Sequence, residues 1–350
     1  MDQVNFLEQL VSIPSPSGEE KQVGQFLVEQ MTTLGFQAHL DKVGNAVGVM
    51  GEPDAGRKIV LLGHMDTVTG YIPVQRRGNL LYGRGAVDAK GPLATFILAT
   101  ARMGAKLQDT CITVIGAVEE EAFSKGARHL AKTMRAPDFC VIGEPSDWEC
   151  ITLGYKGRLC VDYTWEQPDS HSAGEQAGPA EKAITFWNQL MDYAEQRNHG
   201  REGHFDTLDP ALRDFRTYSD GLSTGVKMSV TMRLPPDFKP EILKRKMRMW
   251  AKGAKLKSLP LDMPYRQDDK NNPLVRAMLR AIRAKGGRPR FKLKTGTSDM
   301  NTVGPAWGCP IVAYGPGDSS LDHTPDEHID VEEYKRAIAV LARALETLGT

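Results

Sequence analysis

Residues 58–68 read KIVLLGHMDTV, and this stretch indicates the fold class. Ile59–Leu62 is a continuous apolar run of strand length, which is typical of a strand covered on both faces. Outward from it, the predicted order is a helix at 90–103, a strand at Cys111–Val118, a helix at 126–134 and a strand at Asp138–Ile142. Buried strands that alternate with helices predict an α/β domain with a mainly parallel sheet.

The segment before this stretch predicts a helix followed by two short strands. Ser17 and Glu20 have the spacing of a capping box, in front of an apolar-periodic segment that stops at Gly35. Two short β-like runs follow, at Phe36–Leu40 and Asn45–Met50. The α/β pattern therefore begins near the start of the chain.

The pattern changes near residue 155. Lys156–Trp165 and Val226–Leu234 alternate between apolar and polar residues, as strands with one exposed face do, and helices are expected at 180–196 and 240–252. After about residue 265 the α/β pattern returns, with a helix at 273–285, a strand at 310–314 and a helix from Val331. We predict an α/β domain formed by residues 1–155 and 265–350, interrupted by a smaller α+β domain at 156–264.

Length and composition exclude several classes of protein. The chain has 350 residues, which suggests about two domains, and 44 basic residues balance 44 acidic ones. A zero net charge argues against a dedicated nucleic-acid-binding protein. No apolar run is long enough to span a membrane, and the N-terminus lacks a signal-peptide pattern. The five cysteines contain no CxxC motif, which favours free thiols and a cytoplasmic location.

Side chains that can bind metals follow the predicted strands directly. They are His64 and Asp66, the triplet Glu119, Glu120 and Glu121, then Glu144, and His323 in a Gly-rich loop. Ligands of an open α/β sheet bind beyond the carboxyl ends of its strands, so these side chains are expected to converge at one edge. Asp88, in the Gly-rich segment Tyr82–Gly91, can approach the same edge.

Two histidines with several carboxylates and no thiolate suit zinc, cobalt or manganese. Five protein ligands are too many for one tetrahedral catalytic zinc, but they fit two ions bridged by a carboxylate, as in many hydrolytic sites. Each residue alone has a plainer explanation, because loop histidines and runs of glutamate are often surface features. Ligand-type residues occur after four predicted strands, and this combination favours a metal site. Within the glutamate triplet, any of the three residues could take each role.

Five motifs together resemble the di-zinc metallopeptidase and deacylase family. They are GHMDTV (63–68), YGRGAVDAKG (82–91), VEEEAFSKGA (118–127), IGEPS (142–146) and LDHTPDEH (321–328). The family includes succinyl-diaminopimelate desuccinylase, acetylornithine deacetylase, aminoacylase and glutamate carboxypeptidase. The motifs VEEEAFSKGA and KTGTSDMN (294–301) most resemble the branch that releases lysine or ornithine from an acidic amino-group carrier protein, in lysine and arginine biosynthesis.

The resemblance implies a catalytic domain with two divalent ions, most often zinc, with cobalt as an alternative. Carried over by motif, it implies one ion bound by His64 and Glu144, the other by Glu121 and His323, and both bridged by Asp88. It makes Glu120 the general base and Asp66 the residue that orients His64. Glu119 stands where the family usually has aspartate, which is a mild departure.

For the inserted domain, the resemblance implies a lid that also forms a homodimer. His171, in DSHSAG (169–174), is implied to stabilise the oxyanion in the partner's active site. Arg233 is implied to pair with a substrate carboxylate, although an exposed strand-end charge is the plainer explanation. Thr297, Ser298 and Asn301 are implied to face the substrate.

Charge distribution favours a protein substrate. Residues 239–257 carry eight basic residues and the single acid Glu241, and residues 276–294 carry eight basic residues and no acid. Such faces can steer an acidic partner, although solvated helix faces explain them as well. The alternatives are a small-molecule deacylase, acting on acetylornithine or acetyl-lysine, and a metal-binding protein without turnover. The presence of Glu120 and Asp88 argues against the last.

Overall fold

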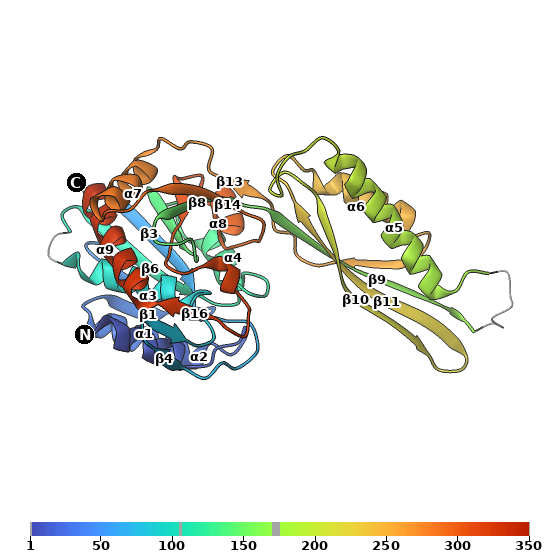
Figure 1. Cartoon of the computed structure of the whole chain (residues 1–350), viewed down its shortest axis with the longest axis horizontal. Helices are drawn as coiled ribbons and strands as arrows, with labels where there is room; N and C mark the ends of the chain where they lie inside the picture. The colour runs from blue at the N-terminus through green and yellow to red at the C-terminus, as the bar shows by residue number, and fades with distance from the viewer. Residues whose placement is uncertain (1, 105–106, 170–175, 350) are drawn as a thin grey trace. The chain divides into compact units, whose positions relative to one another are not determined.

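The computed structural model describes residues 2–104, 107–169 and 176–349. The chain divides into two compact units, each with its own hydrophobic core (Figure 1). The first unit comprises Met1–Gly154, Arg266–Leu293 and Ser298–Thr350. The second, the inserted unit, comprises Tyr155–Tyr265 and Lys294–Thr297.

The first unit is built on a nine-stranded sheet in the order β1-β2-β6-β3-β7-β15-β8-β13, with β14 also paired to β8. The strands are β1 (Gln37–Leu40), β2 (Ala46–Met50), β3 (Arg57–His64), β6 (Thr110–Ala117), β7 (Phe139–Gly143), β8 (Cys150–Tyr155), β13 (Tyr265–Arg266), β14 (Arg290–Lys294) and β15 (Ile311–Ala313). Parallel pairs join β6, β3, β7 and β15 in the middle. Antiparallel pairs join β1 to β2, β2 to β6, and β8 to β15. The α/β fold class is confirmed, and the sheet is mixed toward its edges.

Helices cover the sheet. They are α1 (Gln3–Val11), α2 (Lys21–Thr33), α3 (Lys90–Ala101), α4 (Lys125–Thr133), α7 (Pro273–Ala284), α8 (Met300–Trp307) and α9 (Val331–Leu348). All residues of α3 except the last are buried. The helix packs on β3 and β6 with one side and on α1 and α9 with its other sides. A helix that is apolar all round requires such cover. A small sheet, β16-β5-β4, lies in the same unit, formed by β4 (Gln75–Arg77), β5 (Leu80–Tyr82) and β16 (His328–Asp330).

The inserted unit is a four-stranded antiparallel sheet with two helices. Its strand order is β10-β11-β9-β12, with β9 (Gly157–Pro168), β10 (Asp209–Ser219), β11 (Ser223–Leu234) and β12 (Lys255–Ser258). Burial alternates along β9 and β11, so one face of the sheet packs against α5 (Pro179–Asn198) and α6 (Pro240–Trp250). This is the half-buried pattern that alternation in the sequence indicates.

The predicted capping box at the start of α2 is wrong. Glu20 itself is the N-cap of α2, and no side chain caps the helix. The Ser17 hydroxyl instead donates to Asp66 Oδ2 at 2.7 Å, and Glu20 Oε1 accepts from the backbone N–H of Gly18 and Glu119. Ser17 thus binds a buried side chain distant in sequence, and Glu20 binds the backbone of Gly18 and Glu119 instead of completing a capping box.

All five cysteines are free, and three of them are buried. Across residues 2–104, 107–169 and 176–349, every helix is too short or too polar to span a bilayer.

Candidate metal centre

Parallel pairing brings the ends of three strands together. β3 pairs with β6 as far as His64 opposite Ala117, and with β7 as far as Gly63 opposite Gly143. The glutamate triplet follows β6 and Glu144 follows β7, so both segments start at the edge where His64 ends β3. Glu144 is 7% exposed there, and His64 is 1% exposed.

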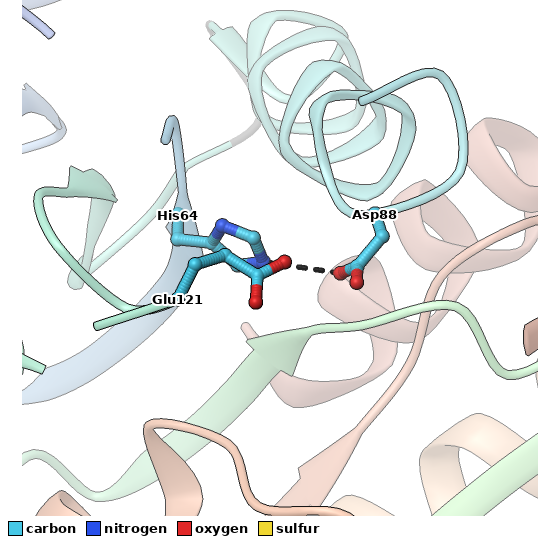
Figure 2. Close-up of side chains that lie close together, drawn as sticks. All are labelled: His64, Asp88 and Glu121. Carbon is cyan, nitrogen blue, oxygen red and sulfur yellow. Dashed lines mark hydrogen bonds and ion pairs between the residues drawn. The ribbon is translucent and has the colours of Figure 1, made fainter. Parts of the chain in front are cut away.

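Asp88 lies between the two histidines. Its Oδ1 is 3.3 Å from His64 Nε2, and its Oδ2 is 3.0 Å from His323 Nε2. Glu121 Oε1 lies 2.8 Å from the same His323 nitrogen. Figure 2 shows His64 and Glu121 directed toward Asp88, and one ligand atom from each of these three lies within 4.8 Å of the others. One carboxylate with an oxygen toward each of two imidazoles fits a bridge between two cations.

The charges of this cluster also suit cations. Hydrogen bonds to Asp88 and Glu121 raise the pKa of His323 to about 10. Burial alone would lower the pKa of His64, but hydrogen bonds to Asp66 and Asp88 raise it well above its ordinary value. The carboxylates thus favour the protonated, positively charged form of both imidazoles. Divalent ions supply the same positive charge, and they bind the deprotonated ligands.

Asp66 is fully buried and fixes the surrounding loops. Its two oxygens accept from the backbone N–H of Glu120 and of Glu121, each at 3.0 Å, and Oδ2 also accepts from Ser17. His64 Nδ1 lies 3.0 Å from the backbone oxygen of Asp66 and 3.4 Å from its Oδ1. Burial opposes ionisation, but hydrogen bonds with His64 and Ser17 lower the pKa of Asp66. An ionised Asp66 therefore orients both the imidazole and the glutamate triplet.

The structure separates the three glutamates. Glu119 has a left-handed backbone, φ 56°, and its carboxylate pairs with the largely exposed Lys125 Nζ at 2.7 Å. Glu121 contacts His323 in the cluster. Burial raises the pKa of Glu120 well above its ordinary range, and the charges of Glu144 and Glu121 raise it further against the opposing effect of His64. Burial raises the pKa of Glu121 as well, to about 7, so the surroundings of both glutamates favour the protonated carboxyl group.

Two predicted substrate residues lie in the inserted unit. Arg233, near the end of β11, donates from Nη1 to Thr297 Oγ1 at 3.2 Å. In the part of the chain that the structure describes, no carboxylate lies within ion-pair distance of Arg233, whereas its cross-strand neighbour Arg158 pairs with Asp262. Burial lowers the pKa of Arg233, and Arg158 lowers it further.

Ser298 and Asn301, the other predicted substrate residues, belong to the first unit and are buried. Asn301 Oδ1 accepts from the Ser298 backbone N–H at 2.9 Å, and Ser298 Oγ accepts from Met300 N at 3.2 Å. These bonds shape the start of α8, and contact with a substrate stays a prediction. His171 lies outside the described residues.

Sequence reasoning missed several side chains that support the centre. Ser17 contacts Asp66, and Glu20 contacts the backbone of Glu119. Glu327, 1% exposed, accepts from the backbone N–H of Asp88. None of the three carries a local pattern that marks this role, since each acts on a segment remote in sequence. The LDHTPDEH motif contains Glu327 but does not distinguish it from Asp326.

Comparison with known proteins identifies close relatives. The profile of peptidase family M20/M25/M40 matches residues 60–347. A LysW-lysine hydrolase of Deinococcus radiodurans is 44% identical, covering 98% of this chain and 96% of the relative. A putative LysW-lysine/LysW-ornithine hydrolase of Thermococcus kodakarensis is 41% identical, covering 99% of this chain and 92% of the relative.

Solved structures share the fold at lower identity. An M20 family metallo-carboxypeptidase of Sulfolobus solfataricus superposes with a TM-score of 0.81 at 18% identity, covering 100% of this chain and 99% of that one. A dinuclear metal-binding M20 peptidase of Bacillus subtilis gives a TM-score of 0.71 at 13% identity, with 99% and 97% covered.

Proposed function

The chain belongs to peptidase family M20/M25/M40, and we propose that it releases lysine or ornithine from an acidic amino-group carrier protein. As a member of this family it is a metal-dependent hydrolase. The observation that supports this substrate is sequence identity above 40%, over nearly the whole chain, to enzymes named for LysW-lysine or LysW-ornithine hydrolysis. One water is consumed, the amide between the carrier's terminal glutamate side chain and the amino acid's α-amine is cleaved, and a carboxylate and an amine result.

We assign the metal ligands from the chemistry of the donors. His64 and Glu144 would hold one ion, Glu121 and His323 the other, with Asp88 between them. When bound, two divalent ions there supply Lewis acidity that activates water and polarises the amide carbonyl. Zinc suits this mixture of imidazole and carboxylate, and cobalt and manganese suit it as well.

Glu120 is the proposed general base. Its raised pKa suits a carboxylate that accepts the proton of the attacking water and then donates it to the leaving amine. Asp66 supports this role, because it holds the backbone of Glu120 and the ring of His64. Arg233, which lacks an ion-pair partner among the described residues, suits a substrate carboxylate.

The two units suggest a division of labour. We assign catalysis to the first unit, which holds the metal cluster, and the lid and dimer contact to the inserted unit, where His171 would stabilise the oxyanion across the dimer. A homodimer and a cytoplasmic location are part of the proposal, and the free cysteines are consistent with a reducing compartment.

Basic surfaces on both units support an acidic protein partner. On the inserted unit, Lys244 is the single basic residue of the 239–257 segment that forms an ion pair among the described residues, and its partner is Glu241 of the same segment. Arg245, Arg248 and Lys252 are exposed on and just after α6. On the catalytic unit, α7 exposes Arg276, Arg280 and Arg283 at helical spacing. Uncompensated charges of one sign accelerate the encounter with a partner of opposite sign.

A hydrolysis assay tests the proposed substrate. Carrier-conjugated lysine and ornithine are compared with acetyl-lysine and acetylornithine, each with and without a chelator. We expect the highest kcat/KM on the carrier conjugates and loss of all activity with the chelator. Higher ionic strength is expected to lower kcat/KM for the conjugates but not for the acetyl compounds, because salt screens exposed charges. Faster turnover of an acetyl compound than of the conjugates would contradict the proposal.

Charge reversal tests the basic surfaces. The pairs Arg245→Glu with Lys252→Glu on the inserted unit, and Arg276→Glu with Arg283→Glu on the catalytic unit, each reverse two of the three exposed positive charges named for that surface. We expect one or both pairs to raise KM for the carrier conjugate roughly tenfold, with KM for acetyl-lysine unchanged. The matched control is Lys132→Glu with Arg135→Glu, which changes net charge equally at exposed positions outside both segments. Equal effects of all three pairs would exclude a local docking surface.

A further inference from the structure

Glu327 is a buried carboxylate whose partners all lie in the loop that carries Asp88. It is 1% exposed and stands directly before β16. Its Oε1 accepts from the backbone N–H of Val87 at 3.0 Å and of Asp88 at 3.1 Å. Its Oε2 accepts from Arg84 Nη1 at 2.7 Å. Such a group is costly to bury unless it is fully paired, and here both oxygens are engaged.

The same short segment therefore holds Asp88 at two points. Glu327 accepts from the backbone N–H of Asp88, and His323, four residues earlier, faces Asp88 Oδ2. With the N–H of Asp88 fixed, its side chain is directed between the two imidazoles. Arg84 extends the contact, because its Nε donates to Gly70 O at 3.1 Å, in the segment that follows Asp66.

We propose that Glu327 is a positioning residue for the carboxylate that bridges the two metal ions. This inference rests on the proposed two-metal centre. Glu327 acts through the backbone of Asp88, which it holds so that the two carboxylate oxygens of Asp88 face different imidazoles. Partners of this kind set metal affinity through the orientation of the ligand they hold.

Glu327→Gln gives the sharpest test, because it keeps the volume of the side chain. Its single oxygen can accept from Val87 and Asp88 or from Arg84, but its amide N–H groups then face a donor. Titration calorimetry of the metal-free protein with Co²⁺ is expected to show dissociation constants about 10–100-fold higher than in the wild type. Glu327→Ala is expected to weaken binding further, and the visible absorption of bound Co²⁺ is expected to change in both variants.

Asp326→Ala is the matched control, since Asp326 is the exposed neighbour of Glu327. It is expected to bind Co²⁺ as the wild type does. Thermal unfolding of each metal-free protein shows whether it is folded. If folded Glu327→Gln binds two ions with wild-type affinity and absorption, the inference is overturned and the two-metal proposal stands. If the wild type itself does not bind two ions, the two-metal proposal is overturned, and this inference with it.

Discussion

Glu120→Gln is expected to lower kcat by about 10²–10⁴-fold while the protein keeps its full metal content. Glutamine preserves the volume of the side chain, and its backbone N–H still donates to Asp66 Oδ1. An amide does not accept the proton of the attacking water, so the loss falls on the chemical step. The measurement is kcat on the carrier conjugate together with metal analysis of the same preparation.

The neighbouring Glu119→Gln is the matched control for this variant. It makes the same chemical change one residue earlier, where the carboxylate pairs with the largely exposed Lys125, and surface ion pairs contribute little. We expect wild-type kcat from Glu119→Gln. Near-normal turnover by Glu120→Gln, or equal losses in both variants, would show that the proton is carried by another group.

Asp88→Asn is expected to lose bound metal as well as activity. Asparagine offers one carbonyl oxygen in place of the two carboxylate oxygens that face His64 and His323. We expect fewer than two ions in each chain and a fall in kcat of about 10³-fold or more, because bound ions supply several kcal/mol of transition-state stabilisation. Metal content and kcat measured on one sample separate this result from that of Glu120→Gln.

The control for Asp88→Asn is Asp268→Asn, which removes the charge of an exposed aspartate in the same unit, paired with Arg266. It is expected to keep both metal content and kcat. Two ions and wild-type turnover in Asp88→Asn would remove Asp88 from the bridging position. The remaining ligands would then have to hold the metal without it.

The central strands could be predicted because their middle residues form continuous apolar runs. β3, β6 and β7 are buried on both faces, so their sequences are continuously apolar in the middle, and the predicted bounds of β6 and β7 lie within one residue of the observed ones. β10 (Asp209–Ser219) has no such signal. It is an edge strand, largely exposed, and becomes a strand by pairing with β11. β8 is buried along its whole length but is absent from the predicted strands.

For the candidate site, the sequence predicts the location but not the role of each glutamate. Ligand-type residues just after buried strands indicated the edge where His64, Asp88, Glu121 and His323 do lie close together. The triplet of glutamates could not be divided by pattern, since three identical residues in a row offer the same chemistry. The left-handed turn at Glu119 and the two N–H bonds to Asp66 divide it.

What the sequence by itself determined is the α/β class and the kind of ligands, because burial and donor chemistry are properties of single residues and their spacing. What only the tertiary structure decided is which side chains support those ligands. Ser17 was expected to cap a helix and instead binds Asp66, 49 positions away. Glu327 reaches the backbone of Asp88 across 239 positions. A hydrogen bond depends on distance in space, and chain folding, rather than local spacing, sets that distance.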